Sequence, residues 1–372
     1  MPVREQVPLA PHTTLRLGGP AARFAEAGTD DELIGAVRAA DLAAEPVLVL
    51  GGGSNLVVAD DGFPGTVVHV ATRGIGIEPE PGSPAVTVTV AAGEDWDRLA
   101  GQCAATGLSG LECLSGIPGL AGASPIQNVG AYGHEVAETI VSARAYDRLR
   151  DRVVELTAAE CEFGYRTSLF KRRAGARRGA AADPAVATGR YVILGVRFRL
   201  ARDPLSAPVG YAELARALDV PEGSRAPLAE VREAVLLLRR GKGMVADPAD
   251  PDTRSAGSFF TNPVLTAGQF AAVERAAAAR AGRPVAVPRF PAGDGQVKVP
   301  AAWLIEQAGF AKGYPAGGAA RISAKHTLAL TNPGGASAAD LLALAGEISR
   351  GVAQAFGVQL ASEPVLVGAE LP

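Results

Sequence analysis

Four short segments of the sequence carry residue types that suit chemistry as well as packing. The first, residues 51–55, has the sequence GGGSN and places three glycines before two side chains that can donate hydrogen bonds. Consecutive glycines let backbone amides converge on an anion, so this segment fits a pyrophosphate. A plain turn is the competing interpretation, and this segment taken alone does not exclude it.

The second segment, residues 107–133, is rich in glycine and carries few charges. A surface linker would be more polar, so we expect a buried loop or a loop that covers a ligand. Backbone groups of such a loop can hydrogen-bond a flat heterocycle, and Gln127 and Asn128 add donors and acceptors of the right kind. A structural Ω-loop is the alternative.

The third and fourth segments each place one reactive side chain beside aromatic residues. In FGYRTS, residues 163–168, Arg166 follows a tyrosine on which it can stack while its planar fork faces a carboxylate. In GSFFTNP, residues 257–263, Ser258 lies between a glycine and two phenylalanines. This context predicts a hydroxyl in a partly dry pocket, where hydrogen bonds are stronger. A surface arginine and a serine that caps a turn are the alternatives.

Helix and strand signals surround these segments and must position them. Thr29 and Glu32 form a capping box, which predicts that a helix begins there. Further helix signals start at Trp96, Pro227 and Ser337. Short apolar or alternating runs predict strands, one of them directly before the first glycine segment: 46–50, 66–70, 86–90, 192–200 and 363–367. Because helices and strands are mixed throughout, we expect an α+β fold.

Length, charge and hydropathy exclude several classes of protein. With 372 residues the chain should form about two or three domains. Its net charge of −3 argues against a dedicated nucleic-acid binder. No apolar stretch reaches the ~18 residues that a membrane span needs, and the first residues lack the apolar core of a signal peptide. We therefore expect a cytoplasmic protein without a membrane partner.

Common signatures of other chemistries are missing from the sequence. There is no Walker A loop and no GxSxG nucleophile elbow, and the nearest dinucleotide fingerprint follows a helix instead of a strand. The four histidines are not paired at helical spacing, and the three cysteines form no CxxC pair, so we expect no metal site. The thiols should be reduced and mostly buried.

Taken in order, six segments resemble the UDP-N-acetylenolpyruvoylglucosamine reductase family, flavoenzymes that make UDP-N-acetylmuramate for bacterial peptidoglycan. The resemblance runs from about residue 12 to residue 369 and rests on these ranges: 50–56, 116–134, 163–169, 257–264, 303–310 and 363–369. The second and fourth are the most diagnostic. Residues 209–214, VGYAEL, resemble the tyrosine-containing segment of one family type, while the basic loop at 171–190 is longer than usual.

The resemblance implies an α+β fold with a two-lobed FAD-binding region of the vanillyl-alcohol-oxidase (PCMH) type and a C-terminal α+β substrate-binding domain. We expect the FAD region at 1–205, with the boundary between its lobes near residue 75. Residues 206–362 should form the substrate-binding region, including the tyrosine loop. Residues 363–372 should return as a strand to the FAD region.

The resemblance also implies roles for individual residues. Arg166 is expected on the substrate carboxylate, and Ser258 is expected to donate a proton. Glu363 should lie near the same carboxylate, either protonated or orienting Arg166 and water. The expected contacts to the UDP portion are Tyr211, Lys242 and Asn262. The expected FAD contacts are Gly51, Gly52, Gly53, Ser54, Asn55, Gly116, Ile117, Pro118, Gly119, Gly122, Ala123, Gln127, Asn128 and Gly130.

The implied reaction is the reduction of the enolpyruvyl group of a UDP-sugar, with bound FAD as cofactor and NADPH as co-substrate. We expect a monomer with no metal and no nucleic-acid partner. Two other interpretations stay open. An FAD-linked oxidase of the same fold would consume oxygen with an alcohol or sugar and would not use NADPH. A nucleotide-sugar-binding regulatory module would contain no flavin.

Overall fold

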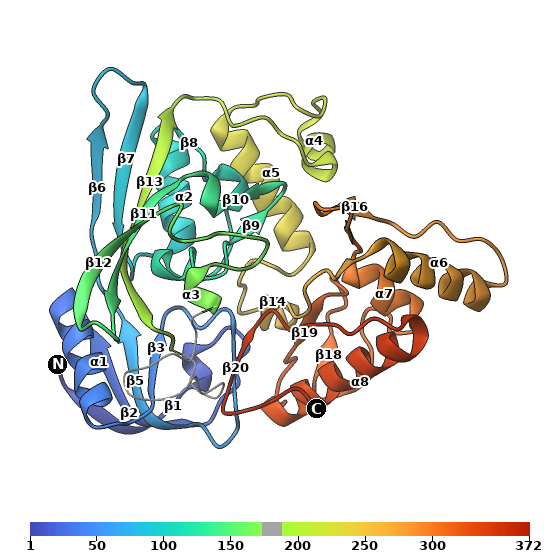
Figure 1. Ribbon diagram of the computed structural model, residues 1–372, viewed down its shortest axis with the longest axis horizontal. Coiled ribbons are helices and arrows are strands. Elements are labelled where there is room, and N and C mark those ends of the chain that lie inside the picture. The colour runs from blue at the N-terminus through green and yellow to red at the C-terminus, as the bar shows by residue number, and fades with distance from the viewer. Residues whose placement is uncertain (173–187) are drawn as a thin grey trace.

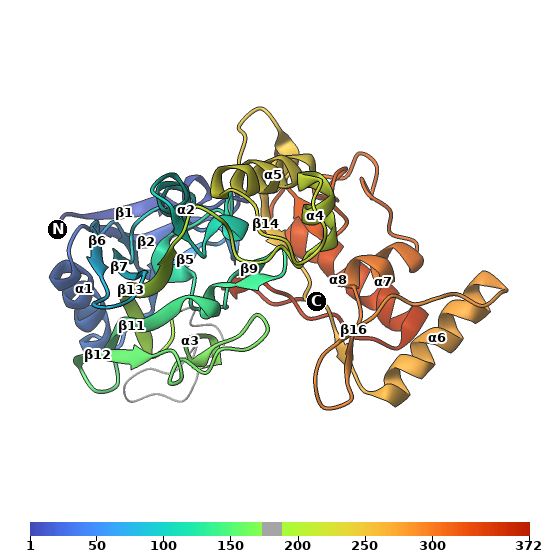
Figure 2. The same ribbon diagram turned by 90° about the horizontal axis from the view of Figure 1, so that it is seen from above.

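The computed structural model describes residues 1–172 and 188–372, which form two lobes and a C-terminal unit (Figure 1). The exposed loop expected at 171–190 lies mostly outside the described residues. Figure 2 shows the N-terminal lobes at one end of the molecule and helices α6 (Ala267–Ala281), α7 (Ala301–Gln307) and α8 (Ala338–Phe356) at the other.

The first lobe is a four-stranded sheet with the strand order β1-β2-β5-β3. β1 pairs antiparallel with β2, whereas β2, β5 and β3 run parallel. Their bounds are β1 Val3–Pro8, β2 Pro20–Ala27, β3 Val47–Leu50 and β5 Phe63–Val70. The expected capping box of Thr29 and Glu32 is confirmed and starts helix α1 (Asp30–Leu42), which buries Leu33 and Val37.

The second lobe is an antiparallel sheet with the order β12-β11-β13-β7-β6, and β8 pairs with β13. Helix α2 (Trp96–Ala105) buries Trp96, Leu99 and Cys103, the face that helical spacing predicts. The strand bounds are β6 Ile75–Pro79, β7 Ala85–Ala91, β8 Leu108–Ser109, β11 Ile140–Asp147, β12 Arg152–Thr157 and β13 Tyr191–Arg202. The helix and β8 lead directly into the glycine-rich loop.

Two helices extend from the second lobe toward the C-terminal unit. They are α4 (Ala212–Leu218) and α5 (Leu228–Gly241). Val231 and Val235 of α5 share an apolar core with Cys113 and Tyr132 of the glycine-rich loop. The residues expected to hold the UDP portion from this side are therefore anchored to the FAD region.

The C-terminal unit holds two small sheets under its helices. One has the order β14-β19-β18 and the other β15-β17-β16. The bounds are β14 Ser255–Ser258, β15 Val264–Leu265, β16 Phe290–Pro291, β17 Val297–Lys298, β18 Arg321–Ile322 and β19 Ala329–Thr331. Leu15, Leu17 and Val57 of the first lobe belong to the core of this unit, so the two pack as one body.

The chain returns to the first lobe at its end. β20 (Val365–Val367) pairs in parallel with β4 (Leu56–Val58), which directly follows the first glycine segment. Nearby, the carboxylate of Asp60 accepts hydrogen bonds from the amides of Ala338 and Ala339, at 2.7 and 3.0 Å. An acidic side chain of the first lobe thus satisfies the free amides at the start of α8.

The described residues also bear on partners. None of the helices among them is long and apolar enough to cross a membrane. The described part of the chain holds no cluster of three or more histidine, cysteine or acidic side chains that could bind a metal ion. The expectation of buried thiols is confirmed, and burial raises the pKa of Cys103, Cys113 and Cys161 to about 12.

Replacing Asp60 by alanine should destabilise the protein by about 1 kcal/mol, because two amides at the start of α8 lose their acceptor. The shift in the urea midpoint measures this effect. Asp61→Ala is the matched control, since this neighbour is exposed and takes no part in the helix cap. Equal midpoints for the two variants would show that the contact between lobe and helix contributes nothing.

Candidate active site

Two glycine-rich loops meet at the candidate cofactor site. A Cβ atom on Gly52 would lie 2.8 Å from the Cα atom of Gly119, so the two backbones approach more closely than side chains allow. A Cβ atom on Gly119 would lie 2.7 Å from the Oγ atom of Ser54, and Gly119 has a φ of +122°. The loops at 51–55 and 107–133 therefore form a single structure.

The neighbouring glycines of the first loop differ in what they require. Gly53 has a φ of +60°, and a Cβ atom there would lie 2.0 Å from the carbonyl oxygen of His12. At Gly51 the nearest atom to such a Cβ would be the Cδ1 atom of Leu120, at 3.8 Å. Gly53 is therefore needed for the packing of the loop itself, whereas a Cβ atom at Gly51 would make only ordinary van der Waals contacts.

Other predicted cofactor contacts lie along the second loop. The amide of Gly116 donates to the carboxylate of Asp97 at 2.6 Å, and the amide of Gly122 donates to the carbonyl of Ala92 at 2.9 Å. Both glycines are buried. The remaining predicted contacts between them and beyond are partly or fully exposed: Ile117, Pro118 and Ala123.

The side-chain amides of this region already have protein partners. The Nδ2 atom of Asn55 donates to the Oε1 atom of Gln127 at 2.6 Å and to the carbonyl of Glu363 at 3.4 Å. Asn128 is 1% exposed, and its Nδ2 atom donates to the carboxylate of Glu135 at 2.7 Å. The assignment of these amides to a bound heterocycle stays a prediction, and the structure gives them a role in holding the loops.

Arg166 lies at the edge of the second glycine-rich loop with its guanidinium fixed on several sides. Its Nη2 atom donates to the carbonyl of Gly130 at 2.7 Å, and its Nη1 atom donates to the carbonyl of Asn128 at 3.3 Å. Its Nε atom lies 3.3 Å from the Oε1 atom of Glu363. The expected stacking on Tyr165 is present, with the guanidinium carbon 5.4 Å from the ring centroid. Arg166 is therefore oriented before any substrate binds.

Ser258 lies at the end of β14, beside the segment that carries Glu363. The amide of Glu363 donates to the carbonyl of Phe259 at 2.8 Å. In the part of the chain that the structure describes, the Ser258 hydroxyl has no hydrogen-bond partner. The structure thus brings the segments of Arg166, Ser258 and Glu363 together, although they lie far apart in the sequence.

Two opposing effects act on the pKa of the Glu363 carboxyl. Its side chain is 14% exposed, and burial raises its pKa above the ordinary range. The positive charges of Arg166 and Lys171 act in the opposite direction. Sequence reasoning left open whether Glu363 is protonated or orients Arg166. The 3.3 Å ion pair favours the second alternative, and burial favours the first.

The residues expected to hold the UDP portion from the FAD side flank α4 and α5. Tyr211 precedes α4, and its ring meets the ring of Tyr132 edge-on at 5.6 Å. Lys242 follows α5, and its Nζ atom lies 2.5 Å from the Oε2 atom of Glu213 and 5.6 Å from the Tyr132 ring centroid. Lys242 is therefore paired with Glu213, an acid of the tyrosine segment. The sequence alone did not predict this pair.

Two further cations, Arg239 and Lys312, act with Lys242 on His326 and were also missed. Burial and, after it, the charges of these three residues lower the pKa of His326 to about 4, so its imidazole is neutral near pH 7. The Nε atom of Arg239 is buried without a hydrogen-bond partner among the described residues. This concentration of positive charge suits an anion such as a diphosphate. In the sequence, only the closeness of Arg239 to Lys242 indicates that positive charge gathers here.

Asn262 approaches from the C-terminal unit. Its Oδ1 atom accepts a hydrogen bond from the amide of Ala301 at 2.9 Å, which caps the start of α7. Lys298 of β17 lies nearby over the ring of Tyr165, with its Nζ atom 4.3 Å from the centroid. Asn262 therefore has a structural task here, and its contact with the UDP portion stays a prediction.

The chain is similar to known proteins along almost its whole length. A model described as the UDP-N-acetylenolpyruvoylglucosamine reductase C-terminal domain matches residues 248–367, and an FAD binding domain model matches residues 21–157. The chain is 56% identical over 365 residues to the UDP-N-acetylenolpyruvoylglucosamine reductase of Thermobifida fusca, covering 98% of each chain. The chain belongs to the UDP-N-acetylenolpyruvoylglucosamine reductase family.

Further relatives of the reductase family agree. The protein of the same name from Streptomyces coelicolor is 55% identical over 373 residues, covering 100% of this chain and 92% of the relative. The crystal structure of the enzyme from Thermus caldophilus superposes with a TM-score of 0.62 at 25% identity, covering 98% of this chain and 99% of the other. The expected α+β fold with a PCMH-type FAD region is confirmed, and the chain is an FAD oxidoreductase, a UDP-N-acetylmuramate dehydrogenase.

The residues present fit the FAD of the reductase family. Gly52 and Gly119 bring two backbones together with no Cβ atom between them. The hydroxyl of Ser115, next to Gly116, is buried without a hydrogen-bond partner among the described residues. An unpaired buried hydroxyl costs free energy unless a ligand or water meets it. Close backbones and a free hydroxyl are what a pyrophosphate or flavin ring requires.

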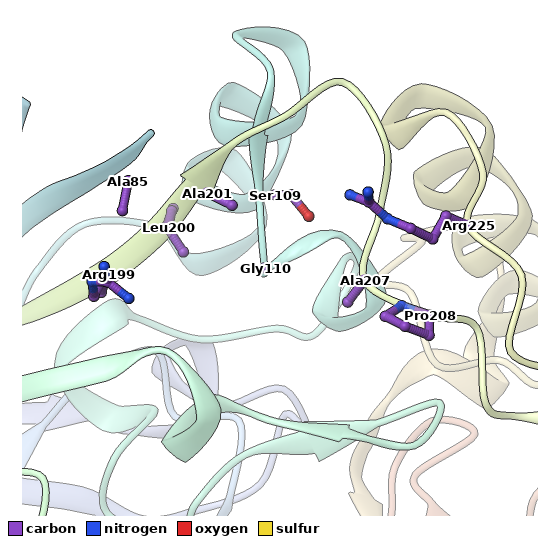
Figure 3. A pocket seen from close by; sticks show the side chains of 9 residues that line it. All are labelled: Ala85, Ser109, Gly110, Arg199, Leu200, Ala201, Ala207, Pro208 and Arg225. Atoms are coloured by element: carbon purple, nitrogen blue, oxygen red, sulfur yellow. The ribbon is translucent and has the colours of Figure 1, made fainter. Parts of the chain in front are cut away.

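One hollow is lined by none of the predicted site residues. It has a volume of about 330 Å³ and lies between the sheet of the second lobe and the segment before α4 (Figure 3). Its arginines, Arg199 and Arg225, form ion pairs with Glu80 and Asp203. Because both charges are neutralised within the protein, this hollow offers no free cation to an anionic ligand.

Replacing Gly52 by valine should release FAD from the reductase, because the new side chain would push the Gly119 backbone away. The ratio of absorbance at 450 nm to that at 280 nm should fall to near zero, with the circular dichroism retained. Gly76→Val is the control, since nothing lies within 4 Å of a Cβ atom there. A Gly52→Val protein that keeps its full flavin absorbance would show that the first loop is only a turn and does not bind FAD. Gly53→Val should also disturb the fold, because it would collide with His12.

Proposed function

We propose that the protein reduces UDP-N-acetylglucosamine enolpyruvate to UDP-N-acetylmuramate with NADPH, in the synthesis of peptidoglycan precursors. The observation that supports this most is the meeting of Arg166, Glu363 and the Ser258 segment. The Arg166–Glu363 ion pair measures 3.3 Å, and one main-chain hydrogen bond joins Glu363 to the residue after Ser258. An oxidase of the same fold has no need of this combination.

The FAD region would hold its cofactor between the loops at 51–55 and 116–130, with the contacts expected from the sequence. Bound FAD supplies hydride chemistry at the enolpyruvyl group. The acceptor is the methylene carbon of the substrate, and negative charge then develops on the adjacent carbon and spreads into the carboxylate. The protein must stabilise that charge and provide a proton.

Arg166 stabilises the developing charge. Its guanidinium is fixed by the carbonyls of Asn128 and Gly130, so it needs no reorganisation when the carboxylate gains charge. Its position in the left-handed region, with a φ of +52°, directs the side chain back over the glycine-rich loop. Glu363 limits the motion of the guanidinium by pairing with its Nε atom.

Ser258 provides the proton. A serine is a weak acid, but an enolate-like carbanion is a strong base, so transfer works when geometry is fixed. The hydroxyl has no partner among the described residues and is free to meet the substrate carbon. Its segment is fixed by the pairing of β14 with β19 and by the hydrogen bond from Glu363 to Phe259.

Tyr211, Lys242 and Asn262 hold the UDP portion in this proposal. The positive charges of Lys242, Arg239 and Lys312, which act together on His326, favour the diphosphate. The diphosphate must compete with Glu213 for the Lys242 ammonium. We further propose that the protein acts as a cytoplasmic monomer on this UDP-sugar, with no nucleic-acid or membrane partner.

The visible spectrum of the purified protein tests the proposal. Bound flavin should bleach on anaerobic addition of NADPH and recover on addition of the enolpyruvyl sugar. Recovery with oxygen and an added sugar, without use of NADPH, would establish the oxidase instead. A colourless protein that binds a UDP-sugar would establish a binding module.

Replacing Arg166 by lysine should strongly slow reduction of the enolpyruvyl sugar. Lysine keeps the charge but cannot span the carbonyls of Asn128 and Gly130 and the Glu363 carboxylate together. Steady-state turnover at saturating NADPH measures the loss, and flavin content should stay normal. Turnover near that of the wild type would show that Arg166 does not bind the substrate carboxylate.

Replacing Ser258 by alanine should separate the two half-reactions. Flavin bleaching by NADPH should keep its rate, while reoxidation by the enolpyruvyl sugar should slow by ~10²–10⁴-fold, the usual contribution of a general acid. A Ser258→Cys variant should recover part of the rate, since a thiol can donate a proton. Stopped-flow measurement of each half-reaction decides the matter. Equal slowing of both would make Ser258 a structural residue.

A further inference from the structure

Arg166 is flanked by two carboxylates. Glu363 lies 3.3 Å from its Nε atom, and Glu135 lies 4.0 Å from its Nη1 atom. One guanidinium between two acids carries no surplus positive charge. A substrate carboxylate would be a third anion at the same place, so the assigned residues alone leave the site short of positive charge.

Lys171 supplies a cation on the other side of Glu363. Its Nζ atom donates to the main-chain carbonyl of Glu363 at 3.4 Å, and its positive charge acts on the Glu363 carboxyl. The lysine is partly buried, and burial lowers its pKa. A lysine gains nothing by leaving water unless a negative charge compensates it, and Glu363 is the acid whose charge acts on it.

The position of Lys171 is fixed by its own short helix. It belongs to α3 (Leu169–Arg172), whose first turn is anchored where the Ser168 hydroxyl donates to the carbonyl of Ile126 at 2.5 Å. Phe170 is buried and meets the ring of Tyr191 edge-on at 5.9 Å. These contacts hold the helix on both sides of Lys171, whose Nζ atom donates to the main-chain carbonyl of Glu363.

We propose that Lys171 is a positioning residue of the active site. It holds the main chain of Glu363, and its charge offsets the Glu363 carboxylate, so that Arg166 keeps positive charge for the substrate carboxylate. The inference rests on the proposed function, because it assumes that a substrate carboxylate binds at Arg166. It adds a role for Lys171, two residues beyond the arginine segment 163–169, that the family resemblance does not supply.

The titratable groups that face Glu363 come from two elements. Arg166 and the ring of Tyr165 face it from the arginine segment, and Lys171 faces it from α3. Glu135 acts through Arg166, and Lys298 lies over the Tyr165 ring. Of these, Lys171 is a cation that contacts Glu363 and that no other part of the proposed mechanism uses.

The test is the pH profile of reoxidation by the enolpyruvyl sugar. Lys171→Met removes a cation that lowers the pKa of Glu363, so that pKa should rise. The limb of the profile that reports Glu363 should move to higher pH by about one unit, whichever protonation state is the active one. Glu363→Gln identifies this limb, since it removes the titrating group.

Matched variants separate charge from packing. Lys171→Arg keeps the charge and should leave the limb near its wild-type position. Arg172→Met is the control on the same helix, because Arg172 pairs with Glu162 at the surface and should leave the profile unchanged. Lys171→Gln repeats the test if the methionine variant does not fold.

The outcomes are distinct. A limb that moves in the methionine or glutamine variant and stays in the arginine variant supports the inference. An unmoved limb in a folded, flavin-loaded variant overturns it, as does an equal shift in the arginine variant. A wild-type enzyme that does not reduce the enolpyruvyl sugar overturns the proposed function, and this inference with it.

Discussion

The ion pair between Arg166 and Glu363 joins distant parts of the chain at a place with little water. The two side chains are 21% and 14% exposed, so neither charge is well solvated. A buried pair of this kind is stable only when further hydrogen bonds complete it. The carbonyls of Asn128 and Gly130 serve the guanidinium. Much of the loop geometry around the site follows from this requirement.

The need for further hydrogen bonds also explains why the two glycine-rich loops are connected to the Arg166–Glu363 pair. Asn55 binds both Gln127 of the second loop and the main chain of Glu363. A displacement of either glycine-rich loop would therefore move the Glu363 segment as well. The residues proposed to hold the UDP portion come from two parts of the molecule. Tyr211 and Lys242 flank α4 and α5, and Asn262 belongs to the C-terminal unit. Bound substrate would bridge the two.

Local signals predicted the elements well, because they depend on neighbours in the sequence. The capping boxes of Thr29 and Ser337 and the buried face of α2 are examples. The resemblance supplied the family and the three catalytic candidates. The pairing of Lys242 with Glu213 and the second role of Asn55 could not be predicted. They depend on which side chains meet across the fold, and no periodicity encodes that.

The first lobe and the C-terminal unit are joined by contacts between residues very distant in the sequence. Asn332 donates to the carbonyl of Leu15, Thr14 donates to the carbonyl of Ser255, and β20 lies beside β4. Contacts of this kind close long loops, whose entropic cost must be met before the contact forms, so they slow folding. The second lobe, with contacts closer in sequence, can fold earlier. Arg166 and Glu363 are themselves almost 200 residues apart, so the loop-closure argument places their pairing late in folding, after the local contacts within each lobe.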